Sequence, residues 1–174
     1  TASPIGDTLP LLLSLDAKII LDGAKSRELI SLNEFFISYR KTMLKKGQFI
    51  YSVKIPIYKK NIFKAYKISK RFDDDISSVC GSFNIEIDKN RIKKIKIAYG
   101  GMSEIPKRAK KTEKTLINSI FSEKIFVKAI KNLEIDYKPI DDMRASKSYR
   151  MEIAKNLLLK CFLEVKNNKT LRVN

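Results

Sequence analysis

The sequence of 174 residues contains no histidine and only two cysteines, Cys80 and Cys161. The chain therefore lacks the side chain that most often serves as a general base in enzymes. Two cysteines outside a CxxC spacing do not supply the ligands of a structural zinc or an iron–sulfur cluster, and we expect both to be free, buried thiols. Any redox chemistry would then depend on a bound cofactor rather than on protein side chains.

Long apolar runs and phosphate-binding glycine motifs are also missing. No run approaches the ~20 apolar residues that span a bilayer, and residues 9–13 form too short a run for a signal sequence. We therefore expect a cytoplasmic protein without a membrane partner. Neither GxGxxG nor GxxxxGKS/T occurs in the chain, so neither type of phosphate-binding loop is predicted.

The charge of the chain raises a second hypothesis. Hydrophobic residues make up 44% and charged residues 32%, as in folded domains, but the net charge is +17. A basic interaction module or nucleic-acid-binding module could carry such a charge, and it would bring the lysines between Lys89 and Lys114 onto one face. Lys outnumbers Arg by 28 to 8, whereas base recognition relies on Arg. Because no basic run interleaved with aromatic residues occurs either, no nucleic-acid partner is expected.

The residue pattern in the first third of the chain predicts short strands. Residues 17–21 and 27–31 predict a hairpin, and residues 49–55 alternate as a strand that ends at Pro56. Ile50 stands out because it is apolar on the polar face of this strand, where either a loop or a ligand could cover it. Upstream, Asp7 and Thr8 can cap a short helix over residues 9–15.

The remaining chain predicts an antiparallel sheet followed by helices. Residues 62–70, 78–87 and 92–99 alternate as three strands, and we expect this meander to have one face in water. Helices are predicted over residues 113–120, 123–133 and 146–165, capped by Thr112, Ser122 and Ser146. In the last helix we expect Tyr149, Cys161 and Phe162 to be buried and Glu164 to face outside. The fold class is therefore α+β, with helices on one face of an antiparallel three-stranded sheet. The polar stretch 56–61 is the predicted boundary between residues 1–58 and 59–174.

A charged bend joins the first two of these strands. Lys67 lies among small or apolar neighbours on its strand, and Lys70 and Arg71 precede three adjacent aspartates, Asp73–Asp75. Three adjacent carboxylates repel one another and favour a turn. The residues alone allow two readings, a solvated connection or a ligand-binding loop.

Five segments, in this order along the chain, carry a resemblance to a known family. They are Thr1-Ala2-Ser3-Pro4-Ile5-Gly6-Asp7, Tyr39-Arg40-Lys41-Thr42, the run from Lys67 to Gly81, Tyr99-Gly100-Gly101-Met102 and Asp142-Met143-Arg144-Ala145-Ser146. Together they resemble the FAD-binding part of xanthine dehydrogenase, a molybdenum hydroxylase, over nearly the whole chain. The resemblance implies that residues 1–58 are the tail of an α+β FAD-binding subdomain. Residues 59–174 would be the C-terminal subdomain found in flavoproteins such as carbon monoxide dehydrogenase.

The resemblance also implies roles for individual residues. Asp7 would form a hydrogen bond with FAD, Ile50 would pack on the flavin ring, and Lys67 would touch the flavin. The loop from Arg71 to Asp75 would border the opening for the electron acceptor, where Asp74 would affect the access of anionic NAD. Phe72 departs from the basic residue of some relatives, which leaves the choice between NAD and oxygen open.

The resemblance further implies partners outside this chain. Purine hydroxylation would occur at a molybdenum cofactor in a molybdenum-binding subunit, and electrons would pass through an iron–sulfur domain to FAD. The glycine-rich loop that holds the FAD pyrophosphate belongs to the preceding half of such a domain, so we expect weak or absent FAD binding by this chain alone. A medium subunit like that of carbon monoxide dehydrogenase or aldehyde oxidase is an alternative, although the run 70–76 favours the xanthine type.

Overall fold

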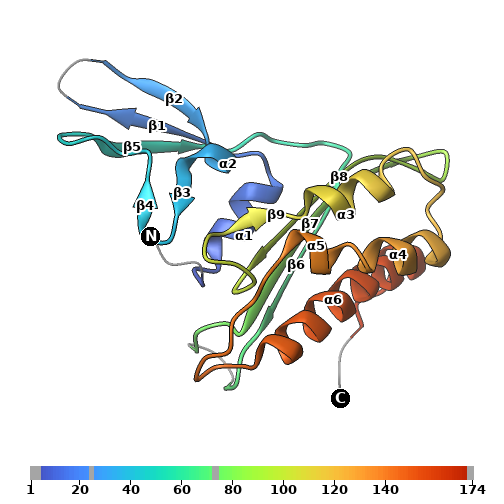
Figure 1. Cartoon of the computed structure of the whole chain (residues 1–174). Helices are drawn as coiled ribbons and strands as arrows, with labels where there is room; N and C mark the ends of the chain where they lie inside the picture. Colours follow the sequence, from blue (N-terminus) through green and yellow to red (C-terminus); the bar gives the residue numbers. More distant parts are fainter. Residues whose placement is uncertain (1–4, 24–25, 72–74, 172–174) are drawn as a thin grey trace.

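The computed structural model describes residues 5–23, 26–71 and 75–171 as two groups of elements (Figure 1). The first group contains α1 (Thr8–Ser14), β1 (Lys18–Asp22), β2 (Glu28–Ser31), α2 (Leu32–Phe35), β3 (Phe36–Ser38), β4 (Lys41–Thr42) and β5 (Phe49–Lys54). The second contains β6 (Ile62–Ile68), β7 (Val79–Asp88), β8 (Arg91–Gly100), β9 (Lys107–Arg108), α3 (Lys110–Leu116), α4 (Glu123–Ile130), α5 (Leu133–Asp136) and α6 (Lys147–Asn167).

The first group is built on a small antiparallel sheet in the order β2-β1-β5. The predicted hairpin is β1 and β2, and the strand predicted over residues 49–55 is β5. In the turn before β5, Gly47 has φ +83°. The alternation of β5 does not lead to a buried face, because Phe49 and Val53 are 55% and 44% exposed. β5 lies at the edge of its sheet, and no described layer covers it.

The second group is built on a four-stranded antiparallel sheet in the order β6-β7-β8-β9. The three predicted strands are confirmed, and the two-residue β9 extends the sheet beyond β8. Helices α3 to α6 cover one face, where Phe83, Tyr99 and Tyr137 pack edge to face. The α+β fold class expected from the sequence is thus confirmed.

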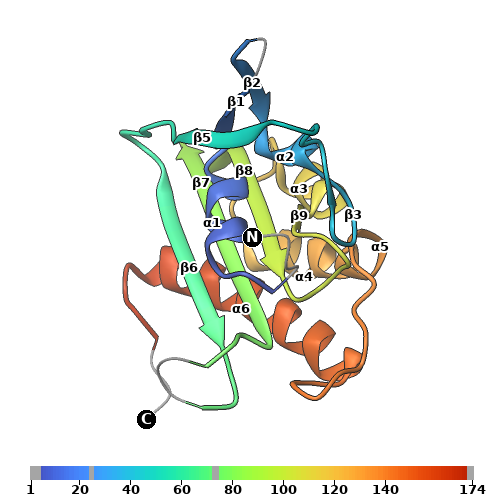
Figure 2. The same ribbon diagram turned by 90° about the vertical axis from the view of Figure 1, so that its left-hand side faces the viewer.

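On the other face of this sheet α1 covers β7 and β8, so the predicted solvent-exposed face is wrong for these two strands. Figure 2 shows α1 in front of β7 and β8 with the long helix α6 behind them. Ser14 Oγ lies 2.7 Å from Ser82 Oγ, and Asn84 Nδ2 donates to the Ser14 carbonyl oxygen at 3.0 Å. Ser82 and Asn84 of β7 are therefore buried on this face, with their side-chain hydrogen bonds satisfied by Ser14 of α1.

This position of α1 bears on the predicted boundary after Tyr58. Leu9 and Leu13 of α1 belong to a second hydrophobic cluster that includes Ile19 of β1 and Ala98 of β8. The cluster therefore joins residues before and after the boundary. Because α1 of the first segment packs on the sheet of the second, the two segments share a hydrophobic core. The division into subdomains 1–58 and 59–174 stays a prediction.

The helix caps differ in part from those expected. Ser146 caps α6 as predicted, with its Oγ accepting from the Tyr149 N–H at 3.2 Å. Asp7 occupies the N-cap position of α1, but its side chain makes no capping hydrogen bond. Thr112 does not cap α3, which begins earlier; the carboxylate of Asp136 accepts from the N–H groups of Lys111 and Thr112 instead. That cap comes from 24 residues away and leaves no local sequence signal.

The exposed and buried faces of α6 also differ from those expected. Glu164, expected outside, is 2% exposed because it accepts hydrogen bonds from Tyr66 at 2.9 Å and from the Leu171 N–H at 3.1 Å. Tyr149, expected in the core, is 48% exposed at the first turn of the helix. Cys161 and Phe162 are buried as predicted.

Candidate cofactor-binding site

An ion pair between two predicted site residues forms the centre of the candidate site. Lys67 Nζ of β6 lies 3.2 Å from Asp7 Oδ2 at the start of α1. The two side chains are 39% and 37% exposed, so the pair lies at the surface on the α1 side of the sheet. The structure brings Asp7 and Lys67 together although 60 positions separate them, which the sequence order alone does not show.

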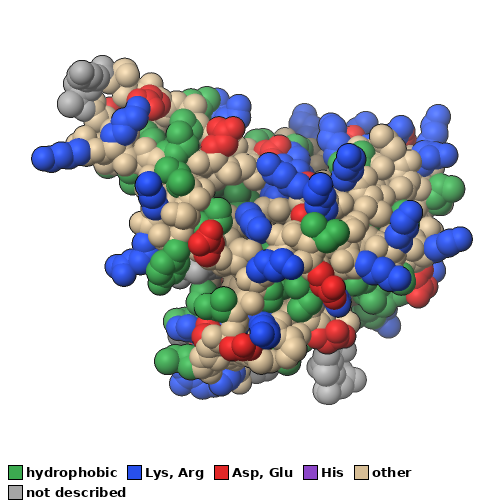
Figure 3. All heavy atoms as spheres, viewed as in Figure 1, with side chains coloured by type: hydrophobic (Ala, Val, Ile, Leu, Met, Phe, Trp, Pro, Cys, Tyr) green, Lys and Arg blue, Asp and Glu red, His purple; other side chains and the backbone are tan. Residues whose placement is uncertain are grey.

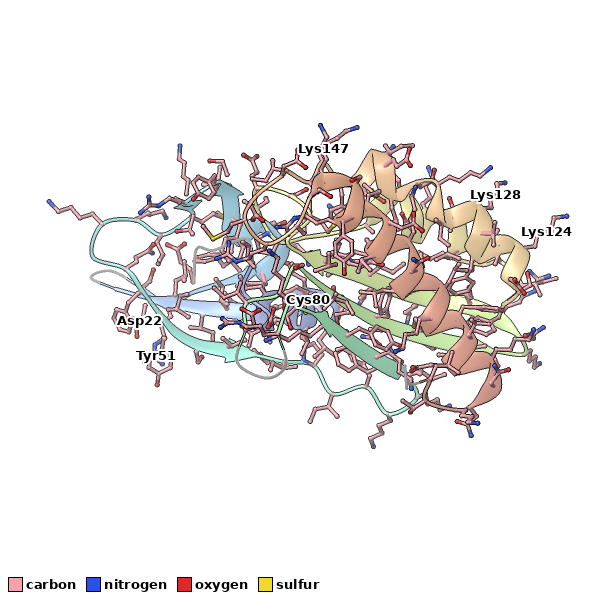
Figure 4. All side chains as sticks on the ribbon, turned by 90° about the horizontal axis from the view of Figure 1, so that it is seen from below. Asp22, Tyr51, Cys80, Lys124, Lys128 and Lys147 are labelled. Atoms are coloured by element: carbon pink, nitrogen blue, oxygen red, sulfur yellow. The ribbon has the colours of Figure 1, made fainter. Side chains whose placement is uncertain are left out.

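The geometry of the pair follows from strand alternation. On β6, Tyr66 and Ile68 pack against the helical core, so Lys67 points to the opposite face, toward α1. Directly opposite Lys67 on β7 stands Cys80, whose thiol donates to the Asp7 carbonyl oxygen over 3.7 Å (Cys80 is labelled in Figure 4). The hydrogen bond from Cys80 thus attaches the Asp7 backbone to β7, the strand paired with the one that carries Lys67.

The buried thiol beneath the pair stays protonated. Burial, reinforced by the negative charge of Asp7, raises the pKa of Cys80 to about 12, although the Lys67 ammonium opposes this shift. Cys80 and Cys161 are both free and buried, which confirms the expectation for the two cysteines. Cys80 therefore acts as a small packing residue and weak hydrogen-bond donor at the site.

One oxygen of the ion pair has no partner in the described part of the chain. Asp7 Oδ1 is buried and accepts no hydrogen bond from residues 5–23, 26–71 or 75–171. A buried carboxylate oxygen without a donor is unfavourable, so it fits a ligand that brings a hydroxyl or N–H group. The adjacent Lys67 ammonium supplies donors for ligand oxygens. Ribityl hydroxyls and ring carbonyl oxygens of a flavin match these two requirements.

Ile50 is not part of this cluster. It lies on β5, paired with Leu21 of the small sheet, and is 43% exposed. Its exposed aliphatic side chain could contact a planar apolar ligand, but the structure does not bring it against Asp7 or Lys67. Of the three predicted cofactor contacts, the structure therefore pairs Asp7 at the start of α1 with Lys67 of β6 and places Ile50 on the separate small sheet.

The bend after β6 is stabilised by its own polar groups. The Arg71 N–H donates to Asp75 Oδ2 at 3.0 Å, and the Arg71 guanidinium lies 3.4 Å from Asp75 Oδ1. This hydrogen bond to Arg71 lowers the pKa of Asp75. The Arg71 side chain is otherwise exposed at 82%. Asp74 and Phe72, for which the sequence predicted an influence on the acceptor, lie outside the described residues.

A cavity of about 680 Å³ lies near the Asp7 turn. Its lining includes Ile5, Tyr39, Gly101 and Asp142, which come from four of the five segments that carry the family resemblance. Arg150 of α6 also contributes to the lining, and sequence reasoning missed it. Its only sequence signal is an arginine on the expected inner side of a helix.

The lysine-rich stretch expected of a nucleic-acid-binding module does not converge on one face. Lys96 pairs with Asp16 on the α1 side of the sheet, whereas Lys110 and Lys114 are exposed on α3, on the opposite side. Figure 3 shows Lys and Arg side chains spread over the visible face, with acidic groups between them. This distribution does not favour a nucleic-acid interface.

Within residues 5–23, 26–71 and 75–171, no group of three or more His, Cys, Asp or Glu residues is arranged to hold a metal ion. Among these residues, no helix combines the length and apolar character needed to cross a membrane.

Two family descriptions match successive parts of the chain. Residues 1–58 match the FAD binding domain in molybdopterin dehydrogenase, and residues 64–165 match the CO dehydrogenase flavoprotein C-terminal domain. The second match covers more than half of the 174 residues.

Individual relatives agree with these matches. Xanthine dehydrogenase from Dictyostelium discoideum is 37% identical over 154 residues, which cover 78% of this chain and 11% of that protein. The glyceraldehyde dehydrogenase medium chain from Sulfolobus acidocaldarius is 30% identical over 94% of this chain and 58% of its own length. The chain thus spans about a tenth of the xanthine dehydrogenase and somewhat over half of the medium chain.

Solved structures show the same fold at low identity. Carbon monoxide dehydrogenase from Hydrogenophaga pseudoflava superimposes with a TM-score of 0.85 at 18% identity, covering 90% of this chain and 55% of that one. Quinoline 2-oxidoreductase from Pseudomonas putida 86 gives a TM-score of 0.83 at 19% identity, covering 98% of this chain and 59% of that one. From the family matches and this shared fold, the chain belongs to the CO dehydrogenase flavoprotein C-terminal domain family, with an FAD-binding-domain segment in front of it.

Proposed function

We propose that this chain is part of the FAD-binding unit of a xanthine-dehydrogenase-like molybdenum hydroxylase. In that enzyme, electrons from purine oxidation would pass through iron–sulfur clusters and FAD to NAD or oxygen. The observation that carries the proposal is the Asp7–Lys67 pair, with its 3.2 Å separation and the unsatisfied oxygen of Asp7 beside it. The matched FAD-binding segment and the xanthine dehydrogenase relatives support the same assignment.

The residues of the chain would bind and orient the cofactor, while FAD itself supplies the ability to accept and release electrons. Lys67 would donate hydrogen bonds to flavin oxygens, and its positive charge would favour negative charge on the ring. Asp7 would accept from the ligand through Oδ1 while Oδ2 holds the Lys67 ammonium in place. Ile50 would pack on the ring as an exposed aliphatic surface.

The bend between β6 and β7 would control the access of the electron acceptor. The Arg71 side chain is exposed and its guanidinium contacts Asp75, so its charge can face an approaching ligand. Asp74 would disfavour anionic NAD through its negative charge near the flavin. The iron–sulfur domain and the molybdenum-binding subunit would be the partners, and residues 1–58 and 59–174 would be two subdomains of the flavoprotein.

The decisive test is FAD binding by this chain joined to the preceding half of its FAD-binding domain. Lys67→Met should weaken FAD binding by at least about tenfold, since a charge-assisted hydrogen bond contributes ~1.5–3 kcal/mol. The control is Lys94→Met, which removes a lysine that pairs with Glu86 at 3.1 Å on the same sheet. Equal affinities of the wild type and the Lys67 variant would refute the assigned role.

The isolated chain provides a second measurement. Isothermal titration with FAD should show weak or absent binding, because the glycine-rich pyrophosphate loop of the family does not occur in this sequence. Submicromolar binding by residues 1–174 alone would contradict this expectation. It would mean that the Asp7–Lys67 side contributes most of the binding energy.

A second candidate is the medium subunit of an aldehyde-oxidising enzyme. The observation in its favour is the glyceraldehyde dehydrogenase medium chain, whose match extends over 94% of this chain. The two candidates differ in the substrate that reduces the flavin of the assembled enzyme. Bleaching of the flavin absorbance by xanthine, but not by glyceraldehyde, would support the xanthine type, and the reverse result would support the medium-chain type.

A further inference from the structure

Arg150 is a buried cation whose role the proposed function does not yet include. It lies on α6, is 1% exposed, and donates through Nη1 to the carbonyl oxygens of Ser78 and Gly101, the latter at 3.1 Å. Its Nη2 donates to Asp142 Oδ1 at 2.6 Å. A buried charge is tolerated only where it is paired and hydrogen-bonded, so this arrangement joins three chain segments to one side chain.

Gly101 provides the space for this contact. It has φ +80°, a conformation that residues with a side chain rarely adopt. A Cβ atom at this position would lie 2.5 Å from the Ser78 carbonyl oxygen and 3.0 Å from Arg150 Nη1. Glycine therefore allows the end of β8 to approach both the start of β7 and the guanidinium group.

Asp142 anchors the loop before α6 to the same group. Besides Arg150, its Oδ1 accepts from the N–H groups of Arg144 at 2.8 Å and Ala145 at 3.1 Å. Burial alone would raise the pKa of Asp142, but these backbone hydrogen bonds and Arg150 outweigh it and lower the pKa. The carboxylate therefore stays ionised near neutral pH and keeps the loop on Arg150.

One structural connection leads from Arg150 to the strand that carries Lys67. The Ser78 N–H donates to the Ile68 carbonyl oxygen at 2.7 Å, which closes the bend after β6. The bend also contacts the anchored loop, because Lys70 Nζ donates to the Met143 carbonyl oxygen at 2.7 Å. Both ends of the bend are thus attached to segments that Arg150 holds.

A second connection leads from Arg150 to Asp7. Gly101 follows Gly100, and a Cβ atom on Gly100 would lie 3.0 Å from Pro10 Cγ and 3.6 Å from the Gly6 carbonyl oxygen. The end of β8 is therefore in close contact with the first turn of α1 and with the residue before Asp7. A shift of Gly101 would move the backbone on which the Asp7 carboxylate stands.

We propose that Arg150 is a positioning residue of the flavin site, which sets the geometry of Asp7, Lys67 and the two described ends of the bend without touching the ligand. This inference rests on the proposed function, because the two connections affect ligand binding only if Asp7 and Lys67 bind the flavin. The Asp7–Lys67 pair would then be held in its binding geometry before the ligand binds. Loss of the Arg150 hydrogen bonds would therefore loosen the site locally before it unfolds the sheet.

The first test is hydrogen exchange on the chain without FAD. Arg150→Lys keeps one positive charge but cannot reach all three acceptors in the planar geometry of arginine, and Gly101→Ala adds the colliding Cβ. Both variants should exchange the Ser78 and Arg71 amides about tenfold faster, while Phe83 and Ile97 in the sheet centre keep their protection. The matched control is Lys155→Met, which removes another α6 cation that pairs with Glu134 at 2.7 Å.

The second test is FAD binding by the same variants joined to the preceding half of the FAD-binding domain. Arg150→Lys should weaken FAD binding about tenfold and shift the visible absorption of the bound flavin, whereas Lys155→Met should do neither. Equal loss of protection throughout β7 and β8, unchanged exchange at Ser78, or unchanged FAD affinity would each overturn the proposal. A wild type that binds no FAD would instead refute the proposed function, before any variant is compared.

Discussion

The two sheets of this protein use their apolar residues in different ways. Strands β7 and β8 of the four-stranded sheet are covered on both faces, and Phe83, Ile97 and Tyr99 are fully buried. The β2-β1-β5 sheet leaves Phe49, Val53 and Leu29 about half exposed. The larger sheet therefore carries most of the buried core, whereas the smaller sheet leaves several large apolar side chains exposed.

The largest expected effect contrasts one residue from each sheet. Phe83→Ala should destabilise the chain by about 3–5 kcal/mol, because it creates a cavity between β7 and the aromatic side chains around it. Val53→Ala on β5 should change stability by less than about 0.5 kcal/mol, since that side chain is already 44% exposed. Urea unfolding of both variants measures the difference in free energy of unfolding. Similar losses of stability would contradict the contrast between the two sheets.

The next prediction concerns α1, which precedes the small sheet in the chain but packs on the larger one. Leu13 is 1% exposed within the cluster that includes Ala98, so Leu13→Ala should cost about 2–4 kcal/mol. Leu12→Ala is the control, because Leu12 is only partly buried in the same helix. If Leu13→Ala were nearly neutral, α1 would not contribute to the stability of the larger sheet.

The third prediction uses the buried carboxylate between α6 and β6. Burial alone would raise the pKa of Glu164, but hydrogen bonds from the Leu171 N–H, Lys64 and Tyr66 outweigh it and lower the pKa. A lowered pKa in the folded state means that the stabilisation is present above the unfolded pKa and is lost as the pH falls through the folded one. The chain should therefore become less stable below about pH 4.

Two variants separate this effect from general acid denaturation. Glu164→Gln should lower the stability at pH 7 by about 2–3 kcal/mol, because Lys64 loses its buried partner. The same variant should also show a shallower loss of stability between pH 5 and pH 3 than the wild type. Glu134→Gln, which removes an exposed carboxylate paired with Lys155, is the control. Parallel pH profiles of the wild type and the Glu164 variant would contradict the assignment.

The sequence predicted those features that depend on neighbouring residues. Alternation in residues 78–87 and 92–99 identified β7 and β8, and Ser146 identified the start of α6, because strand period and helix caps are local properties. Features that depend on distant contacts were missed. One face of the meander was expected in water, and only the packing of α1 shows that Ser82 and Asn84 are buried on that face.

The candidate site also contains one residue that local sequence identified and contacts that it did not. Lys67 could be singled out from the sequence because a lysine between Ala65 and Ser69 interrupts a face of small residues. Its pairing with Asp7 depends on the contact between α1 and the sheet, and so was not predictable from residue spacing. Arg150 was missed because its only sequence signal is its place on the inner side of a predicted helix, and its three acceptors come from separate loops.

The smallest predicted effect compares two glycines with positive φ, one in each region. Gly47, in the turn before β5, has φ +83° and no atom within 4 Å of a Cβ placed on it. Gly47→Ala should therefore cost only the backbone strain of a left-handed alanine, about 1 kcal/mol. Gly101→Ala should cost more, because its Cβ also collides with the Ser78 carbonyl oxygen at 2.5 Å. Urea unfolding of the two variants measures this difference. If both lost the same stability, the close contact at Gly101 would relax without cost, and the larger sheet would be less tightly packed at that end than the structure indicates.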